Sequence, residues 1–234
     1  YAKQFFKSLL RAFVECNLKN TELENCIICV PGNHDCNFDN DNAARRMLLG
    51  GLQSAPETVD KSVYEAISVP QEEFRTFVKE IIIDKTYTLS INNDVPIRVG
   101  DKTILFKLYN TAWMSNLNEH QNSILMPISL MEQETHNADL SISIFHHHYS
   151  WLTPSCDNNK NAFRKHILQS SNMVLYGHEH TPSYSQIKDY SEGEVINEFE
   201  GGALCYTHTN GTRESTFNSF IIDLESFECV IRSY

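Results

Sequence analysis

CIICVPGNHDCN, residues 26–37, is the stretch that decides the fold. A short apolar run leads into a Pro-Gly pair, which commonly ends a strand. Asn33, His34 and Asp35 then follow with no hydrophobic residue between them. These side chains can bind a metal ion, carry a proton and orient a histidine. The pattern therefore predicts a buried strand over residues 26–30 with a chemical site at its end.

Two more polar clusters follow short apolar runs in the same way. Three histidines, residues 146–148, come directly after LSISIF, and GHEH, residues 177–180, comes directly after MVLY. In open α/β sheets, sites form at the carboxyl ends of strands, so three such strands would gather imidazole, amide and carboxylate groups at one edge. Each cluster alone is explained equally well as a turn or a polar loop. All three in one chain favour a metal site.

The composition limits the kinds of partner. With 19 basic and 30 acidic side chains, the net charge is −11, which argues against binding nucleic acid through a broad basic surface. A nucleic-acid end held by bound cations is still compatible with this charge. No apolar stretch reaches the roughly 18 residues of a membrane helix, so we expect no membrane partner. Seven scattered cysteines, an odd number, favour reduced thiols and a cytoplasmic location.

Hydrophobic periodicity predicts alternating helices and strands, with a run of strands at the end of the chain. The predicted helices cover residues 2–18, 41–53, 71–82, 128–137 and 161–170. The predicted strands cover residues 26–30, 86–91, 96–99, 103–109, 140–145, 173–176, 194–199, 203–207, 216–223 and 227–232. This order is typical of sheets covered by helices, of α/β or α+β class.

The combination of GNHD, a strand ending in HH and a strand ending in GHxH resembles the calcineurin-like metallophosphoesterase family. The resemblance extends to LYNTAWMS at 108–115, FEGGALCY at 199–206 and SFIIDLES at 219–226, which look like later strands of that family. It implies a four-layer α/β/β/α sandwich, as one domain over residues 1–234. Support is weakest between about residues 40 and 100, and we expect an inserted helical segment at about residues 40–85.

The resemblance also implies a centre of two divalent metal ions. Asn33, His146 and His178 match ligands of one ion, and His180 matches a ligand of the other. His147 replaces His146 if the register of the strand shifts by one residue. Manganese is the expected metal, with iron, zinc, nickel and magnesium as alternatives.

Hydrolysis of phosphomonoesters or phosphodiesters is the function that this resemblance implies, by a hydroxide activated between the two ions. His34 matches a histidine that is not a ligand but lies beside the scissile phosphate, as an acid or a stabiliser of developing charge. Asp35 would hold the ring of His34. His148 stands where the family has proline, and it joins His147 and Tyr149 as candidates for contacts with substrate or ligands. A nuclease of the same fold and a catalytically inactive binding module are the alternatives.

Part of the family's pattern does not occur in this sequence. The family has D-x-H and then G-D before GNHD, and these motifs supply further ligands and the bridging aspartate. The sequence contains no D-x-H, and its one G-D, Gly100-Asp101, follows GNHD between two predicted strands, where a hairpin turn explains it. We therefore expect the two motifs in residues that precede Tyr1, which would complete the N-terminal part of the domain. The substrate and any fused domain stay open at this stage.

Overall fold

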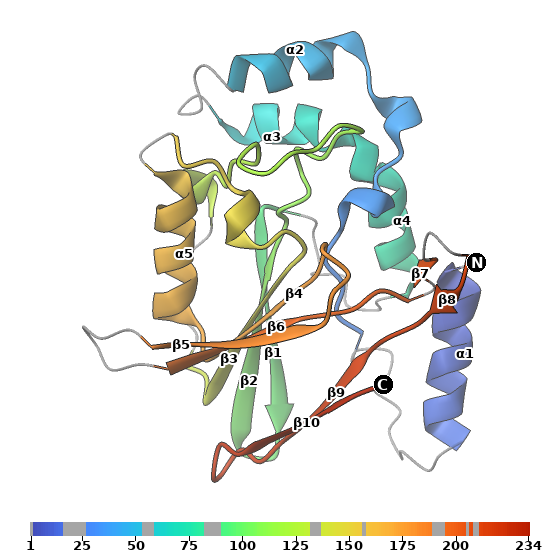
Figure 1. Cartoon of the computed structure of the whole chain (residues 1–234), viewed down its shortest axis with the longest axis vertical. Helices are drawn as coiled ribbons and strands as arrows, with labels where there is room; N and C mark the ends of the chain where they lie inside the picture. The colour runs from blue at the N-terminus through green and yellow to red at the C-terminus, as the bar shows by residue number, and fades with distance from the viewer. Residues whose placement is uncertain are drawn as a thin grey trace.

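The computed structural model describes residues 2–15, 27–52, 59–81, 90–131, 137–155, 158–188, 195–204, 206–207 and 211–234. A six-stranded sheet lies at the centre, and helices flank it (Figure 1). The chain thus has the mixed α/β class predicted from the sequence. Of the helices in these residues, none is both long enough and apolar enough to cross a membrane.

The central sheet has the strand order β1-β2-β3-β4-β6-β5. Its strands are β1 (Asn92–Val99), β2 (Lys102–Tyr109), β3 (Leu140–Phe145), β4 (Met173–Tyr176), β5 (Ser183–Lys188) and β6 (Val195–Glu200). The four inner strands run parallel, while β1 and β5 pair antiparallel at the two edges. The carboxyl ends of the inner strands therefore meet at one edge of the sheet, where sites form in open α/β folds.

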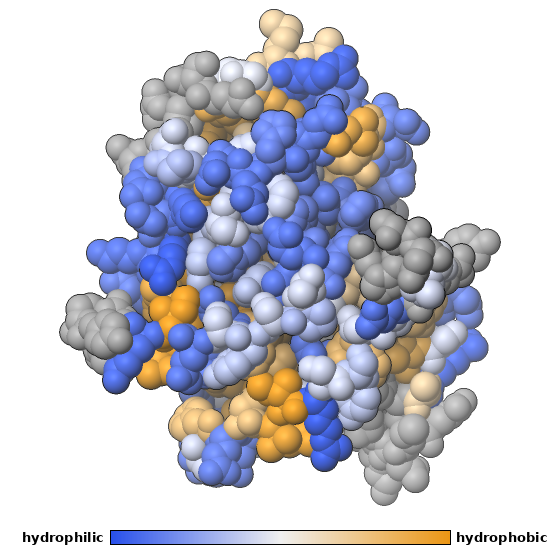
Figure 2. All heavy atoms as spheres, viewed as in Figure 1, coloured by the Kyte–Doolittle hydropathy of each residue, from blue (hydrophilic) through white to orange (hydrophobic). Residues whose placement is uncertain are grey.

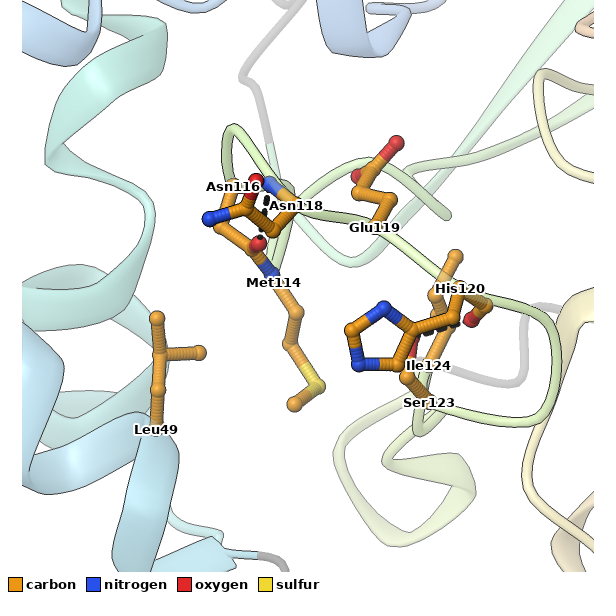
Figure 3. Close-up of a pocket in the computed structure, with 8 residues that line it drawn as sticks. All are labelled: Leu49, Met114, Asn116, Asn118, Glu119, His120, Ser123 and Ile124. Atoms are coloured by element: carbon orange, nitrogen blue, oxygen red, sulfur yellow. Dashed lines mark hydrogen bonds between the residues drawn. The ribbon is translucent and has the colours of Figure 1, made fainter.

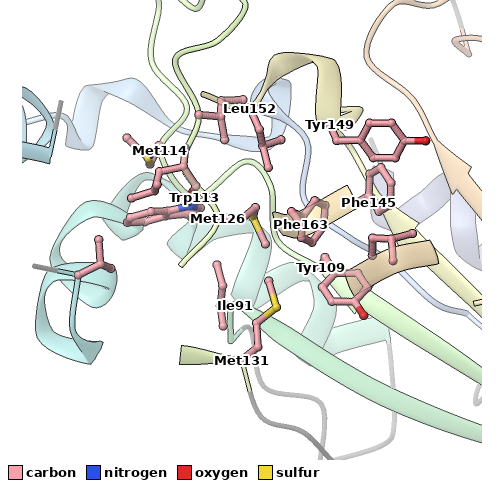
Figure 4. Packing of buried hydrophobic residues seen from close by; sticks show 14 of the residues in the cluster. Ile91, Tyr109, Trp113, Met114, Met126, Met131, Phe145, Tyr149, Leu152 and Phe163 are labelled. Carbon is pink, nitrogen blue, oxygen red and sulfur yellow. Dashed lines mark hydrogen bonds between the residues drawn. The ribbon is translucent and has the colours of Figure 1, made fainter. Parts of the chain in front are cut away.

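The main hydrophobic core lies between this sheet and the helices. The helices are α1 (Ala2–Glu15), α2 (Ala43–Leu52), α3 (Lys61–Ile67), α4 (Glu72–Ile81) and α5 (Asn159–Ser170). Figure 1 shows α2 and α3 above the carboxyl ends of the inner strands, and α5 alongside the sheet. The core centres on the aromatic residues Tyr109, Trp113, Phe145 and Phe163 (Figure 4). Each such side chain contributes about 1.5–3 kcal/mol when it is fully buried, so this core fixes the carboxyl edge firmly.

A second hydrophobic cluster covers the other face of the sheet. Phe199 of β6 packs edge to face against Phe220, with ring centroids 5.2 Å apart. Phe220 belongs to β9 (Asn218–Ile222), which pairs antiparallel with β10 (Cys229–Ser233). The described residues therefore form helix, sheet and sheet layers in succession. Ile221 and Val230 of the small sheet are more than half exposed, and Figure 2 shows apolar side chains gathered in the lower half of a mainly hydrophilic face.

The structure corrects the strand predicted for residues 26–30. Residues 27–30 form no strand, and none of the described strands pairs with them. Ile27 and Cys29 instead pack beside Phe74 and Val78 of α4. The apolar run is therefore held by side-chain burial against a helix and not by backbone hydrogen bonds to a neighbouring strand.

Several other predicted elements differ in extent. The helix predicted for 128–137 is a single 3-10 turn, Ile128–Leu130, and residues 132–136 lie outside the described part. Most of the strand predicted for 86–91 also lies outside it. The strand predicted for 203–207 is reduced to β7 (Tyr206–Thr207), which pairs with β8 (Arg213–Glu214). The sequence analysis does not predict β5, because its mostly polar and exposed side chains give no apolar pattern.

The hairpin turn predicted at Gly100-Asp101 is confirmed. Val99 pairs with Lys102, and Gly100 has a φ of 66°, a left-handed conformation that glycine adopts without strain. The turn precedes β2, so Asp101 lies at the opposite edge of the sheet from the residues that follow β3 and β4. This position keeps Asp101 away from the predicted metal ligands.

Arg45 joins α2 to its neighbours above the carboxyl edge. The residue is 2% exposed, and its Nε and Nη2 donate to the backbone carbonyls of Ile67 and Ser115, each at 2.6 Å. Its Nη1 donates to Oδ1 of Asp41 at 3.0 Å. One buried guanidinium therefore fixes the end of α3 and the loop after β2 relative to α2.

Replacing Arg45 with alanine would leave two buried carbonyl groups without a donor. Each unsatisfied group costs about 1–3 kcal/mol, so we expect Arg45→Ala to lower the free energy of unfolding by about 3 kcal/mol in a urea titration followed by circular dichroism. Arg46→Ala is the matched control, because Arg46 pairs with the same aspartate while 59% exposed, and it should cost less than about 0.5 kcal/mol. Equal losses in the two variants would contradict the role of the buried contacts.

Candidate metal centre

Three chain segments meet at the carboxyl edge of the central sheet. The 3-10 turn Asn33–Asp35 brings Asn33 to this edge, the end of β3 leads to His146, and the end of β4 leads to His178. β3 and β4 are parallel neighbours, so the residues that follow them emerge side by side. The backbone N–H of Gly177 donates to the His146 carbonyl at 3.1 Å and extends this alignment beyond the strands.

The side chains of Asn33, His146 and His178 converge. Nε2 of His146 lies 2.9 Å from Oδ1 of Asn33 and 3.1 Å from Nδ1 of His178. Two nitrogen ligands of one zinc ion, each about 2.0–2.1 Å from the metal, lie roughly 3.3 Å apart. These contacts therefore have the spacing of donors that share one ion. The structure brings together the three residues that the sequence predicts as ligands of a single ion.

Gly32 makes room for the His146 ring. A Cβ atom at position 32 would lie 2.9 Å from both Cε1 and Nδ1 of His146, well inside the optimal contact distance of about 3.5–4.0 Å. The φ of Gly32 is −103°, which any residue can adopt. Glycine is thus required before Asn33 by close approach and not by backbone conformation.

Burial keeps the histidines of this cluster neutral. It lowers the pKa of His146 to about 2, with further contributions from the charges of His147 and His178. Burial and the charge of His147 also lower the pKa of His178 to about 4, although Glu119 acts in the opposite direction. A metal ligand must be a neutral imidazole. Near pH 7, therefore, His146 and His178 can bind an ion without first releasing protons.

His147 joins the cluster from the interior of the protein. It is fully buried, its ring centroid lies 4.4 Å from that of His178, and its backbone N–H donates to Oγ1 of Thr111 at 2.8 Å. Ligand atoms of His146, His147 and His178 all lie within 4.8 Å of one another. Nε2 of His147 lies 3.4 Å from Oε2 of Glu119. The sequence analysis did not include Glu119, and no motif marks it, because it belongs to the irregular segment between β2 and β3.

Glu119 is an ionised carboxylate in a buried place. Burial raises its pKa, but the hydrogen bond to His147 and the charge of that ring outweigh burial and leave the pKa below its usual value. Its Oε1 and Nδ1 of His147 are buried without a hydrogen-bond partner among the described residues. Such atoms cost about 1–3 kcal/mol each, which is a cost that a bound cation can offset.

The segment that carries His178 has a strained backbone. His178 and His180 have φ angles of 84° and 59°, in the left-handed region that non-glycine residues rarely adopt. Trp151 packs its ring against His178 with centroids 4.2 Å apart, and its Nε1 donates to Oε1 of Glu179 at 2.7 Å. These contacts help to hold the strained segment in place. Trp151 is a second site residue that the sequence analysis did not include.

His34 and His180 lie at the rim of the cluster. Their ring centroids are 6.2 Å apart, and His34 is exposed while His180 is half-buried. The carboxylate of Asp35 accepts a hydrogen bond from the backbone N–H of Gly32 at 2.9 Å. One oxygen of this carboxylate is thus directed back onto the backbone by the 3-10 turn, where it stabilises the loop. The role predicted for Asp35, holding the His34 ring, stays a prediction.

His148 and Tyr149 face β6 and its neighbours. Tyr149 is 4% exposed, and its hydroxyl donates to Glu198, whose pKa burial raises to about 7. The ring of His148 packs on Tyr176 with centroids 4.6 Å apart, and its Nδ1 accepts from the backbone N–H of Ser150 at 3.2 Å. The burial of Tyr149 and its bond to Glu198 favour a contact behind the ligands over a contact with substrate, and both stay predictions.

A pocket of about 200 Å³ lies on the loop that carries Glu119 (Figure 3). It is lined by Leu49, Met114, Asn116, Asn118, Glu119, His120, Ser123 and Ile124. In the close-up the Glu119 carboxylate points away from Leu49 and from the His120 ring. Since this carboxylate contacts His147, a single side chain separates the pocket from the histidine cluster.

The donor set fits a divalent transition metal. Imidazole nitrogens suit zinc, nickel, iron and copper, and amide oxygens add a harder donor that manganese also accepts. Close packing at Gly32 and the neutral state of His146 and His178 both favour a preformed site. The arrangement can therefore hold a cation at the carboxyl edge of the central sheet.

A parallel sheet with converging imidazole and amide donors at its carboxyl edge defines an α/β protein with a candidate metal centre. A model of the calcineurin-like phosphoesterase family matches residues 3–182. The chain belongs to the calcineurin-like phosphoesterase family, and the resemblance found in the sequence is confirmed. Membership of this family supports a metal-dependent phosphoesterase in general terms. No curated protein matches the chain.

Among solved structures, the chain is similar to a candidate 5′-nucleotidase from Staphylococcus aureus, crystallised in complex with alpha-ketoglutarate. The two share 15% identity with a TM-score of 0.31, and the match covers 79% of this chain and 41% of that chain. The present chain thus spans about two fifths of the length of that protein. A likeness this distant carries no argument about the site.

Gly32→Ala tests the close approach of the loop to His146. The added methyl group would displace the imidazole, so we expect the affinity for Zn²⁺ to fall at least about tenfold in isothermal titration calorimetry. Gly50→Ala is the matched control, because a Cβ there meets nothing within 4 Å. Alanine at that helical position should keep the affinity and stabilise the fold by about 0.5–1 kcal/mol. An unchanged affinity in Gly32→Ala would contradict the packing argument.

Proposed function

We propose that the protein is a metal-dependent hydrolase of phosphate esters, with the histidines at the carboxyl edge as its metal centre. The observation that carries this proposal is the convergence of Asn33, His146 and His178, with contacts of 2.9 and 3.1 Å, in a member of the calcineurin-like phosphoesterase family. Neutral imidazoles that converge with an amide oxygen at the edge of a parallel sheet support a metal centre there.

Asn33, His146 and His178 would hold one divalent ion, and His180 would bind a second. Ions there, with manganese as the expected metal, would supply positive charge for the phosphoryl oxygens and lower the pKa of an attacking water. The residues behind the ligands keep them in place, because Gly32 leaves room for one ring and Trp151 packs against another. Such outer contacts typically change metal affinity by about 10- to 100-fold.

His34 would act on the leaving group. It is exposed at the rim, beside the ring of His180, where the ester oxygen of a bound substrate can reach it. Its protonated ring would donate a proton to the leaving oxygen or stabilise the negative charge that develops there. Asp35 would contribute indirectly, since it holds the backbone of the loop that carries both Asn33 and His34.

Phosphomonoesters and phosphodiesters both fit this site. The net charge of −11 favours a small ester over a long nucleic acid, because phosphate backbones are bound through clustered basic side chains. We further propose that residues 1–234 belong to one catalytic domain in the cytoplasm, with an inserted helical segment at about residues 40–85. Helices α2, α3 and α4 lie within that range.

His34→Ala and His178→Ala separate the proton donor from the metal ligand. In the full encoded protein, with Mn²⁺ and p-nitrophenyl phosphate or bis-p-nitrophenyl phosphate, we expect His34→Ala to lower kcat about 10²- to 10⁴-fold while metal content is unchanged. His178→Ala should lose both activity and metal. His166→Gln is the control, because His166 contacts the Tyr109 hydroxyl from α5 and should keep full activity.

Two outcomes would overturn this proposal. Wild-type protein that binds metal but hydrolyses neither ester would favour a binding module. Cleavage of single-stranded DNA or RNA with little action on the small esters would favour a nuclease of the same fold.

A further inference from the structure

We propose that His147 is an additional ligand of the ion at Asn33, His146 and His178, and that Glu119 is the carboxylate that orients it. Three imidazoles and one amide oxygen would then be among the ligands of this ion. This inference rests on the proposed function only in placing an ion at these residues. Neither Glu119 nor a third imidazole at this ion is part of the motifs on which the family resemblance depends.

The first support is distance. The rings of His146 and His147 are 4.7 Å apart between centroids, and those of His147 and His178 are 4.4 Å apart. One nitrogen from each of the three rings fits within a mutual distance of 4.8 Å. Two nitrogens on one zinc ion lie roughly 3.3 Å apart, so binding one ion would draw these three nitrogens closer together.

The second support is the hydrogen bonding of a fully buried ring. Nε2 of His147 faces Oε2 of Glu119 at 3.4 Å, while its Nδ1 is buried with no partner in the described part of the chain. If Nε2 carries the proton and donates to Glu119, Nδ1 presents a lone pair that needs a positive partner. A carboxylate that accepts from the second nitrogen of a ligating histidine is a common way to fix the ring on a metal. The hydrogen bonding of the His147 ring therefore favours Nδ1 as the atom that binds the ion.

The third support is the burial of Glu119. Its side chain is 6% exposed, and its second oxygen has no partner among the described residues. A simple ion pair with Glu119 would leave Nδ1 of the buried His147 ring unsatisfied, at the usual cost of about 1–3 kcal/mol. A cation on that nitrogen would satisfy the ring, and the carboxylate charge behind the ring would favour the cation.

Metal titration of Glu119→Gln and His147→Gln in the full encoded protein tests the proposal. The readout is Co²⁺ binding, followed by the visible absorption of the bound ion and by quenching of tryptophan fluorescence. Trp151 lies 4.2 Å from the His178 ring and 5.9 Å from the His147 ring, so Trp151→Phe should remove most of the quenching. We expect Glu119→Gln to weaken binding about 10- to 100-fold and His147→Gln to weaken it at least as much.

His120→Gln is the matched control, since this histidine follows Glu119 in the chain but lines the neighbouring pocket, and it should bind Co²⁺ like the wild type. Glutamine keeps much of the volume at both tested positions, and circular dichroism of each variant verifies the fold. If the His147→Gln variant does not fold, the isosteric Glu119→Gln variant alone tests the proposal. Wild-type affinity for Co²⁺ in Glu119→Gln overturns the proposal. If this result is found but the protein still hydrolyses esters, the proposed function holds without this inference. If Co²⁺ binds as expected but no ester is hydrolysed, this inference holds without the proposed function.

Discussion

The close approach of the Gly32 backbone to the His146 ring is the constraint on which the candidate site depends. It joins a loop near the start of the chain to the end of β3, and the adjacent contact from Asn33 to His146 spans 113 residues. This approach is possible only because position 32 has no side chain and because α4 holds the preceding apolar run in place. The parallel pairing of β3 and β4 then adds His178 from the other side.

Placing these imidazoles in the interior has an electrostatic consequence. Burial and mutual repulsion disfavour the charged form of His146 and His178, so the edge of the sheet presents lone pairs where surface histidines would often carry protons. Outer contacts then fix the rings, through Trp151 for His178 and Glu119 for His147. Burial of these imidazoles lowers the stability of the protein without a metal ion, and the same neutral, closely spaced rings favour the binding of a cation.

The sequence predicts the parts of this protein that local patterns encode. β3 and β4 have the predicted bounds, and α5 and the hairpin at Gly100 are confirmed. The three polar clusters do meet at one edge of the sheet. The strand at 26–30 is wrong because an apolar run looks the same whether it pairs with a strand or packs on a helix. The directions of the Tyr149 and Asp35 side chains could not be predicted, since they depend on turns that the sequence does not reveal. Glu119 and Trp151 could not be found, because only the folded chain brings their loop positions to the histidines.

X-ray absorption at the zinc edge of the protein loaded with one equivalent of Zn²⁺ tests the central claim most directly. The claim is that imidazoles at the carboxyl edge of the sheet hold the ion. The account predicts a first shell of nitrogen and oxygen at about 2.0–2.1 Å, with the outer-shell scattering of imidazole rings reduced in His146→Ala. A sulfur shell at about 2.3 Å, or a shell of oxygen without imidazole scattering, would contradict it.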